Sequence, residues 1–357
     1  MLYEINEKII ELERKGKKII KFHIGDPDQD TDPRIIDAAL KAMKQGKTKY
    51  SSAMGEKDLR DALAEIHGVN ADNIIITPGS KWAIFSIIFL TLEKGDNAIV
   101  PSPHWISYEL ILKKLGIRAK FLKTEIDSEW KIDVGKLESL IDEKTKLIIL
   151  NNPNNPTSKV VNNNTLEEIV EIANNRGVTI LSDETYSEIS FLKTKCILDF
   201  DKNHILVNSF SKTFAMTGWR MGYAILNEEL KNKMTKLNQI TITNVPVFIQ
   251  EAAIKALELK KEISRKIKED YQKRAELACK ILSKSKLKFS RPDAPFYVFP
   301  RCEEIDSEKF VFDLLEKGVA ITPGTSFGDY RDCFRISLTR PDDEIKSGLE
   351  KLVEVIG

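Results

Sequence analysis

The sequence predicts an α/β fold built on a wound parallel sheet. Short runs of β-branched and other apolar residues recur along the chain, separated by segments with apolar residues at helical spacing. Such runs are typical of strands buried on both faces, and alternating strands and helices are typical of a sheet covered by helices. The length of 357 residues allows two or three domains with full-sized cores, which argues against a minimal binding module.

Five apolar runs are predicted as strands of this sheet. They lie at 73–77, 97–100, 146–150, 178–181 and 204–207. The segment 166–176 between two of them has the apolar spacing of a helix and is followed by Gly177, a common helix stop. Ligands of wound sheets bind beyond the carboxyl ends of the strands, so we expect chemistry in the loops after these runs.

The sequence pattern of the last part of the chain predicts a smaller α+β unit. No glycine or proline interrupts the stretch between Pro246 and Pro292, where apolar residues recur every four positions, which indicates one or two long helices. Beyond this stretch, segments 296–299 and 334–338 have the composition of strands, and 307–317 and 342–355 that of helices.

Composition and charge exclude several classes of partner. The 55 Lys and Arg residues nearly balance 54 Asp and Glu, so the net charge of +1 gives no general attraction to nucleic acid or membranes. The longest apolar run, 82–92, is shorter than the roughly 20 residues that cross a bilayer, and the N-terminus lacks a signal-peptide pattern. Four cysteines and four histidines are scattered, which favours a cytoplasmic protein with reduced thiols and no metal site.

Two of the loops after predicted strands offer groups for an anion or for hydrogen bonding. The first, Pro78-Gly79-Ser80-Lys81, opens an apolar helix whose N-terminus could bind a phosphate; an ordinary turn with Ser80 as the N-cap is the alternative. The second, 151–157, contains two Asn-Pro pairs, so asparagine amides stand in an extended backbone; a rigid turn is the alternative.

The other two loops carry charged groups. Asp183 emerges from the end of a buried strand, where a carboxylate needs a cation or hydrogen-bond donors, although its partner could be purely structural. Lys212 follows another strand among serine hydroxyls, and Arg220 stands eight positions later. These two residues could combine an amine nucleophile with an anion clamp, or they could be solvated charges.

Together these loops match the needs of one cofactor, pyridoxal 5′-phosphate (PLP), which requires an amine, an anion site and a carboxylate. The chain resembles the fold-type I, class I/II aminotransferases of the aspartate aminotransferase family over nearly its whole length. The motifs that carry the resemblance are Ser-Phe-Ser-Lys at 209–212, Gly-Trp-Arg at 218–220, Asn-Pro-Thr at 155–157 and Ser-Asp-Glu-Thr-Tyr at 182–186.

The resemblance implies roles for residues around the cofactor ring. Lys212 would hold PLP as a Schiff base, and Asp183 would pair with its pyridine nitrogen. Asn155 and Tyr186 would hydrogen-bond its 3′ oxygen, and Trp105 would stack on the ring. Catalysis would rest on Lys212, Asp183 and Tyr186.

The resemblance also implies phosphate and substrate contacts. The phosphate would be held by residues of two loops, namely Gly79, Ser80, Lys81, Ser209, Ser211 and Arg220. Tyr50 would reach the phosphate of a second subunit, which implies a homodimer with shared sites. Arg335 would bind the substrate α-carboxylate, with Gly25 and Asn155 beside it.

The implied fold is a mainly parallel seven-stranded sheet in a three-layer α/β/α large domain, with a smaller α+β domain. Residues 1–37 would form an N-terminal segment joining the small domain, 38–284 the PLP-binding large domain with a long linking helix, and 285–357 the small C-terminal domain.

The implied activity is ping-pong transfer of an amino group from an L-amino acid to a 2-oxo acid such as 2-oxoglutarate. A PLP-dependent C–S β-lyase and a catalytically silent, aminotransferase-like binding protein are the alternatives. The amino donor stays open, because Lys81 could bind the distal carboxylate of aspartate whereas the aromatic residues Trp82, Trp105, Phe214 and Trp219 could favour apolar side chains.

Three positions depart from the family pattern. Ser158 stands where glycine is usual, so we expect a reshaped turn if that backbone needs a positive φ. Trp82 and His104 replace a glutamine and a tyrosine that are common in relatives, and both are expected near the cofactor.

Overall fold

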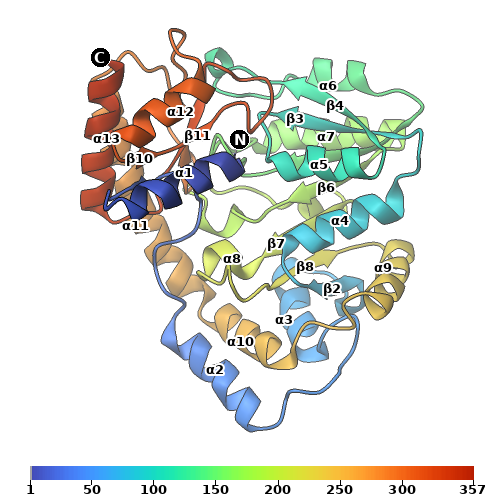
Figure 1. The fold of residues 1–357 in the computed structure, drawn as a ribbon. Helices are drawn as coiled ribbons and strands as arrows, with labels where there is room; N and C mark the ends of the chain where they lie inside the picture. The colour runs from blue at the N-terminus through green and yellow to red at the C-terminus, as the bar shows by residue number, and fades with distance from the viewer. Residues whose placement is uncertain (1) are drawn as a thin grey trace.

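A seven-stranded sheet forms the centre of the computed structural model, which describes residues 2–357 (Figure 1). Within these residues the strands lie in the order β2-β8-β7-β6-β5-β3-β4. Their bounds are β2 Ile74–Thr77, β3 Asn97–Ser102, β4 Arg118–Lys123, β5 Thr145–Asn151, β6 Thr179–Asp183, β7 Ile205–Ser209 and β8 Gly222–Ile225. The predicted fold class is confirmed, and each of the five predicted sheet strands is present.

Strand direction explains where the site forms. Neighbours from β4 through β3, β5 and β6 to β7 pair in parallel, so their carboxyl ends meet at one edge. β8 runs antiparallel between β7 and β2 and leads the chain back across the sheet. The local sequence does not predict β4 or β8, because β4 mixes Lys and Arg with its apolar residues at the sheet edge and β8 spans only four residues.

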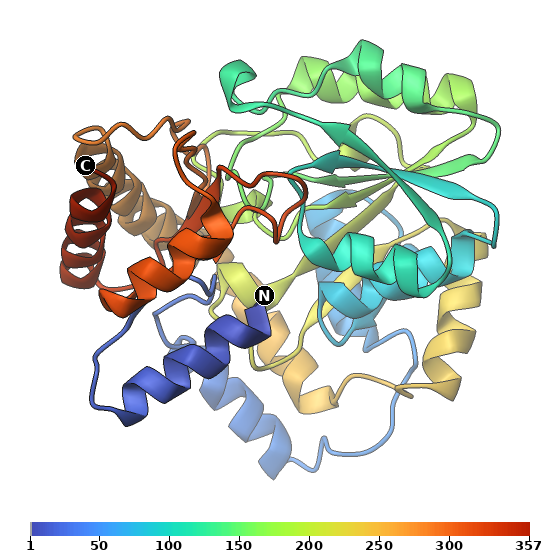
Figure 2. The ribbon, with the colours of Figure 1, turned by 45° about the horizontal axis from the view of Figure 1, so that its top comes forward.

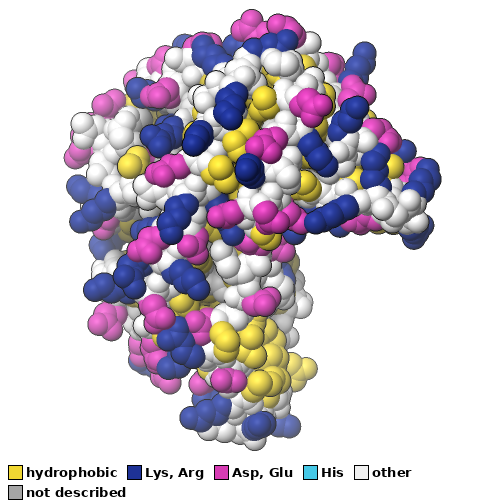
Figure 3. Space-filling model, turned by 90° about the vertical axis from the view of Figure 1, so that its left-hand side faces the viewer, with side chains coloured by type: hydrophobic (Ala, Val, Ile, Leu, Met, Phe, Trp, Pro, Cys, Tyr) yellow, Lys and Arg dark blue, Asp and Glu magenta, His cyan; other side chains and the backbone are white. Residues whose placement is uncertain are grey.

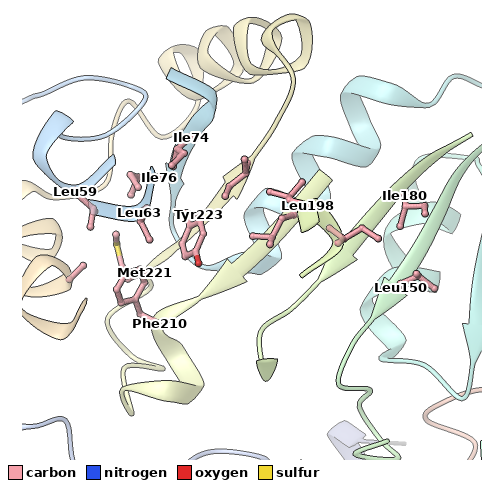
Figure 4. Packing of buried hydrophobic residues seen from close by; sticks show 14 of the residues in the cluster. Leu59, Leu63, Ile74, Ile76, Leu150, Ile180, Leu198, Phe210, Met221 and Tyr223 are labelled. Atoms are coloured by element: carbon pink, nitrogen blue, oxygen red, sulfur yellow. The ribbon is translucent and has the colours of Figure 1, made fainter. Parts of the chain in front are cut away.

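The two faces of the sheet carry separate hydrophobic cores, because successive strand residues point to opposite faces. Figure 4 shows part of the first core, with Ile74, Leu150, Ile180 and Tyr223 among its members. Its helices are α2 Pro33–Lys44, α3 Lys57–His67, α6 Val134–Leu140, α7 Asn163–Arg176 and α10 Val247–Glu258. The second core is covered by α4 Ser80–Thr91, α5 Ile106–Lys114 and α9 Glu228–Ile240.

A smaller unit lies beside the sheet and joins the two ends of the chain (Figure 2). Its strands are β1 Ile20–Lys21, β9 Tyr297–Val298, β10 Val319–Ala320, β11 Thr322–Pro323 and β12 Phe334–Ser337. Its helices are α1 Leu2–Arg14, α11 Lys260–Leu282, α12 Ser307–Glu316 and α13 Asp342–Ile356. Ile5, Ile9 and Phe22 from the N-terminal segment share one core with Leu314 and Leu349. The exact domain boundaries at 37 and 284 stay a prediction.

Two long helices occupy the stretch after Pro246, as expected. α10 ends at Glu258 and α11 starts at Lys260, so the pair is separated by Leu259 alone. α10 packs against the sheet layer, whereas the later part of α11 contributes Ala278 and Leu282 to the core of the smaller unit. α11 thus connects the two units physically.

Short 3₁₀ helices complete the fold, at η1 Ala71–Asn73, η2 Ile126–Ser128, η3 Ser187–Ile189 and η4 Ile197–Asp199. Among the described residues, no helix has the length and apolar character needed to cross a bilayer. All four cysteines are free thiols.

Candidate active site

A cavity of about 470 Å³ opens where the carboxyl ends of the sheet strands face the smaller unit. The predicted residues that line it are Gly25, Ser80, Lys81, Trp105, Asn155, Asp183, Tyr186, Ser209, Ser211, Lys212, Arg220 and Arg335. Gly79 adjoins it through the backbone that precedes Ser80. Tyr50 does not line it, and its side chain is 88% exposed.

Lys212 stands in the cavity on a single helical turn after β7. This turn is α8 Phe210–Thr213, and Ser209 caps it by accepting the backbone N–H of Ser211. The Lys212 Nζ donates a hydrogen bond to the backbone oxygen of Gly25 at 2.5 Å. The amine therefore faces the cavity from the sheet side and touches the N-terminal segment across it.

Asp183 is the most informative group in the cavity. Its Oδ2 accepts a hydrogen bond from the Tyr108 hydroxyl at 2.6 Å, and its Oδ1 accepts from the Thr185 hydroxyl at 2.6 Å. Burial raises the pKa of this carboxyl above its ordinary value even though these hydrogen bonds lower it. It forms no ion pair within residues 2–357, so a cation bound in the cavity would relieve the desolvation of its charged form.

The other end of the cavity gathers donors for an anion. The hydroxyls of Ser209 and Ser211 lie 2.8 Å apart, and α4 begins at Ser80 with its unpaired backbone N–H groups. Arg220, at a positive φ of 57°, donates from Nη1 to the backbone oxygen of Thr217. A Cβ on Gly79 would lie 2.6 Å from Arg220 Nη2, so glycine is needed there for the guanidinium to approach.

The guanidinium of Arg335 on β12 is held in place by two hydrogen bonds. Its Nη1 donates to Asn155 Oδ1 and its Nη2 to the backbone oxygen of His23, both at 2.8 Å. Its buried Nε has no partner within the described chain. The guanidinium lies between two aromatic rings, 4.4 Å from the centroid of Tyr297 and 4.9 Å from that of Phe327. Such a held, planar group suits bidentate binding of a carboxylate.

Several lining residues were not identified from the sequence. Tyr108 and Thr185 contact Asp183, and Tyr297 and His23 lie beside Arg335. Thr185 stands inside the motif at 182–186 and could have been found there. The others come from distant segments, and nothing in their local sequence marks them.

Two expected neighbours of the cofactor lie elsewhere. Trp82 does not line the cavity, because its indole Nε1–H donates to Asn238 on α9 at 3.0 Å. His104 stacks on Phe121 at 4.8 Å and lines a separate cavity of about 250 Å³, and burial lowers its pKa to about 4. Neither of the two residues expected near the cofactor therefore lines the cavity of about 470 Å³ in the described chain.

The aromatic side-chain pocket considered for the substrate is not assembled either. Phe214 is buried in the first core, and Trp219 donates from Nε1 to the Thr31 hydroxyl at 3.1 Å. Of the four aromatic residues considered, Trp105 alone lines the cavity in the described chain.

The residues present fit PLP. One cavity holds an amine, an anion site and a buried carboxylate without a cation, and PLP carries an aldehyde, a phosphate and a protonated ring nitrogen. No group of three or more His, Cys, Asp or Glu within residues 2–357 is placed to hold a metal ion.

The family model described as "Aminotransferase class I and II" matches residues 17–352. This chain belongs to the class I and II aminotransferases. It is 34% identical over 355 residues to the aspartate aminotransferase of Thermococcus kodakarensis, covering 99% of this chain and 91% of that one. It is 36% identical over 360 residues to the (5-formylfuran-3-yl)methyl phosphate transaminase of Methanocaldococcus jannaschii, covering 97% and 93%.

Among solved structures, this aminotransferase is similar to the Thermus thermophilus aspartate aminotransferase with maleate, with a TM-score of 0.95 and 31% identity. The match covers 99% of this chain and 96% of that one. The predicted family, enzyme class and cofactor are confirmed: the chain is a PLP-dependent aminotransferase.

Proposed function

We propose that this aminotransferase moves the amino group of a dicarboxylic L-amino acid, aspartate first, to a 2-oxo acid such as 2-oxoglutarate. The observation that carries the site assignment is Asp183, a buried carboxylate with no cation beside it in the described chain, in one cavity with Lys212 and Arg335. In each of two half-reactions one substrate would bind and one product would leave, which gives ping-pong kinetics.

The proposed roles follow from the contacts. Bound PLP supplies an aldehyde for exchange with the substrate amine and a ring that accepts electrons from the substrate Cα. Lys212 would hold PLP through its amine and would move the proton at the substrate Cα as base and acid. Asp183 holds the ring nitrogen in its charged form, and Arg335 holds the α-carboxylate against Asn155.

Lys81 supports a substrate with a second carboxylate. It lies in the cavity with its Nζ 4.9 Å from the centroid of the Trp105 ring and forms no ion pair in the part of the chain described. Burial, and then the nearby charge of Arg220, lower its pKa. An unpaired cation gains from an anionic partner, and several relatives are named aspartate aminotransferases.

Replacing Lys81 with glutamine should raise KM for aspartate by roughly 10- to 100-fold, because a charged hydrogen bond is lost, while KM for alanine should change little. Steady-state kinetics with both donors at saturating 2-oxoglutarate measure this split. Lys113→Gln on the exposed face of α5 is the matched control. A parallel rise in both KM values, with weaker PLP binding, would instead assign Lys81 to the cofactor phosphate.

A screen of amino donors with 2-oxoglutarate tests the activity as a whole. The expected result is a 2-oxo product from aspartate or glutamate at the highest kcat/KM of the panel. Pyruvate and ammonia released from cystathionine without any oxo acid would favour the C–S lyase. Absence of a 2-oxo product from every common amino acid would reject the proposal.

We also propose a homodimer that shares its active sites. A shallow groove beside α2 is lined by Ile36, Ala39, Leu40, Met43, Gly218, Trp219, Phe248 and Ile249. Figure 3 shows apolar side chains gathered at the lower end of the molecule, where α2 lies. The groove includes Trp219, next to the site residue Arg220, and the exposed Tyr50 follows α2 closely in the chain. A second copy on this surface would bring Tyr50 to the partner's phosphate site.

Charging this surface should separate the subunits. Leu40 and Met43 are 44% and 38% exposed, so Leu40→Asp with Met43→Asp should leave the monomer folded but give a monomeric mass by light scattering. PLP affinity should fall at the same time, because Tyr50 of the other copy is lost. Leu110→Asp on α5, which is 54% exposed, should leave a dimer. A wild-type monomer at micromolar concentration would contradict the proposal.

The proposed location is the cytoplasm. The four free thiols support it, since reduced cysteines are usual in that compartment.

A further inference from the structure

Tyr297 connects the two parts of the site that are proposed to hold cofactor and substrate. It lies on β9 with 2% of its surface exposed and lines the cavity. Its hydroxyl is 3.0 Å from that of Tyr186, and the Arg335 guanidinium carbon lies 4.4 Å from the centroid of its ring. One side chain therefore touches both the tyrosine beside the cofactor and the arginine for the substrate carboxylate.

The hydroxyl pair has a preferred direction once PLP is bound. Within the described residues, neither hydroxyl has another hydrogen-bond partner. If Tyr186 donates its proton to the 3′ oxygen of PLP, its own oxygen is left to accept, and the Tyr297 hydroxyl is the donor beside it. Burial first, and then Tyr297, raise the pKa of Tyr186, so its side chain keeps the proton that this arrangement requires.

Close packing leaves Tyr297 little freedom to turn away. A Cβ on Gly25 would lie 2.0 Å from the Tyr297 hydroxyl oxygen, so the hydroxyl packs directly on that backbone. Gly25 is also the residue whose carbonyl oxygen accepts from Lys212. The ring also makes edge contacts with Tyr186 and Phe296, at centroid distances of 5.9 and 6.3 Å.

Ser158 holds the backbone of Tyr297. Its hydroxyl oxygen accepts the Tyr297 N–H at 3.0 Å, and its backbone oxygen accepts the N–H of Asp293. It has a φ of 53°, a conformation that favours glycine. Serine adopts this positive φ here, and its hydroxyl makes a contact that glycine could not make.

We propose that Tyr297, held by Ser158, is a positioning residue of the transamination site: its hydroxyl directs the Tyr186 proton toward the cofactor and its ring supports Arg335. This inference rests on the proposed roles of Tyr186 and Arg335. A hydrogen bond accepted from Tyr297 makes Tyr186 a stronger donor to the 3′ oxygen, which stabilises the anionic form of the cofactor. The stacked ring keeps the fork of Arg335 aligned without using any of its N–H groups.

The first test is Tyr297→Phe in the PLP-loaded enzyme, because phenylalanine keeps the ring and removes only the hydroxyl. The visible absorption of bound PLP changes with pH, and the midpoint of this change should rise by about half a pH unit. This is the effect of losing one neutral hydrogen bond. KM for the amino acid should stay within about twofold, since the ring still supports Arg335. Tyr223→Phe removes a buried hydroxyl that bonds His67 outside the cavity, and its midpoint should equal that of the wild type.

Tyr186→Phe separates this inference from the roles on which it rests. If its midpoint does not move, the role of Tyr186 itself is wrong. If it moves upward while the midpoint of Tyr297→Phe stays at the wild-type value, only the inference about the Tyr297 hydroxyl is overturned.

Ser158→Gly and Ser158→Ala test how Tyr297 is held. Both remove the hydroxyl, but glycine relieves the positive φ and alanine does not. If Ser158 positions Tyr297, both variants should raise the amino-acid KM by about two- to fivefold despite opposite effects on thermal stability. Two results would show that Ser158 is merely a turn residue. KM could stay unchanged in both variants, or it could change in opposite directions in the two variants, in step with their melting temperatures.

Discussion

Lys212→Ala should reduce turnover with any amino donor by about 10⁴-fold or more, because both the covalent anchor of PLP and the base that moves the substrate proton are removed. The Lys212 amine faces the cavity 2.5 Å from the Gly25 oxygen, on a turn that Ser209 caps. Lys81, the other lysine that lines this cavity, lies on α4, whereas Lys212 lies on α8, so the variant keeps a cavity lysine but loses the one after β7. Fixed-time assays of product formation from aspartate and 2-oxoglutarate measure this loss of turnover directly.

The covalent assignment has its own measurement. Borohydride reduction of the PLP-loaded wild type, followed by peptide mass analysis, should place the label on Lys212 and leave Lys81 unmodified. In the Lys212→Ala protein, PLP should still bind through the anion site and Asp183 but be released by dialysis, because no covalent link remains. A label on another lysine, or full turnover in the variant, would contradict the assignment.

Strong local signals predicted most of the fold. Uninterrupted apolar runs such as 146–150 became buried strands, and the absence of glycine and proline after Pro246 correctly indicated α10 and α11. β8 carries no such signal, since its four residues Gly222–Ile225 are recruited to the sheet by pairing with β2 and β7. Pairing with β2, which is distant in the sequence, and with β7 therefore decides that β8 runs antiparallel in the sheet.

The site was predictable where its residues follow strands and unpredictable where contacts join distant segments. The loop residues Asp183 and Lys212 follow β6 and β7, so the parallel sheet brings them together. Trp82 differs from Lys81 by one position, but a step of one residue on a helix turns the side chain by about 100°, and Trp82 meets Asn238 instead of the cavity. Tyr297 and Tyr186 are 111 positions apart and meet only in the folded chain.

Asp183→Asn should have the second-largest effect, lowering kcat by roughly 10²- to 10³-fold while PLP and substrate still bind. Asparagine keeps the shape and can still accept from the Thr185 hydroxyl, but it cannot balance a positive charge on the ring nitrogen. That charge draws electrons from the substrate Cα, so the proton step should slow most. A primary isotope effect with α-deuterated aspartate, larger in the variant than in the wild type, measures this.

The same substitution should increase the free energy of unfolding of the protein without PLP. Burial raises the pKa of Asp183, so the folded state binds this proton more tightly than the unfolded state does. The resulting cost in stability is absent below the unfolded pKa of about 3.9 and complete only above the folded pKa. Removing the carboxylate should therefore stabilise the apoenzyme more at pH 8 than at pH 4. Denaturant unfolding at the two pH values tests the sign.

Glu184→Gln is the matched control, because Glu184 is also buried, has its pKa raised to about 7 by burial, and lies outside the active-site cavity. It should share the pH-dependent gain in apoenzyme stability and keep the wild-type kcat. A loss of kcat in Glu184→Gln equal to that in Asp183→Asn would mean that general damage at the end of β6, and not charge at the cofactor, explains the effect. If Asp183→Asn instead kept full activity, the ring nitrogen would not need this carboxylate and the site assignment would fail at its central residue.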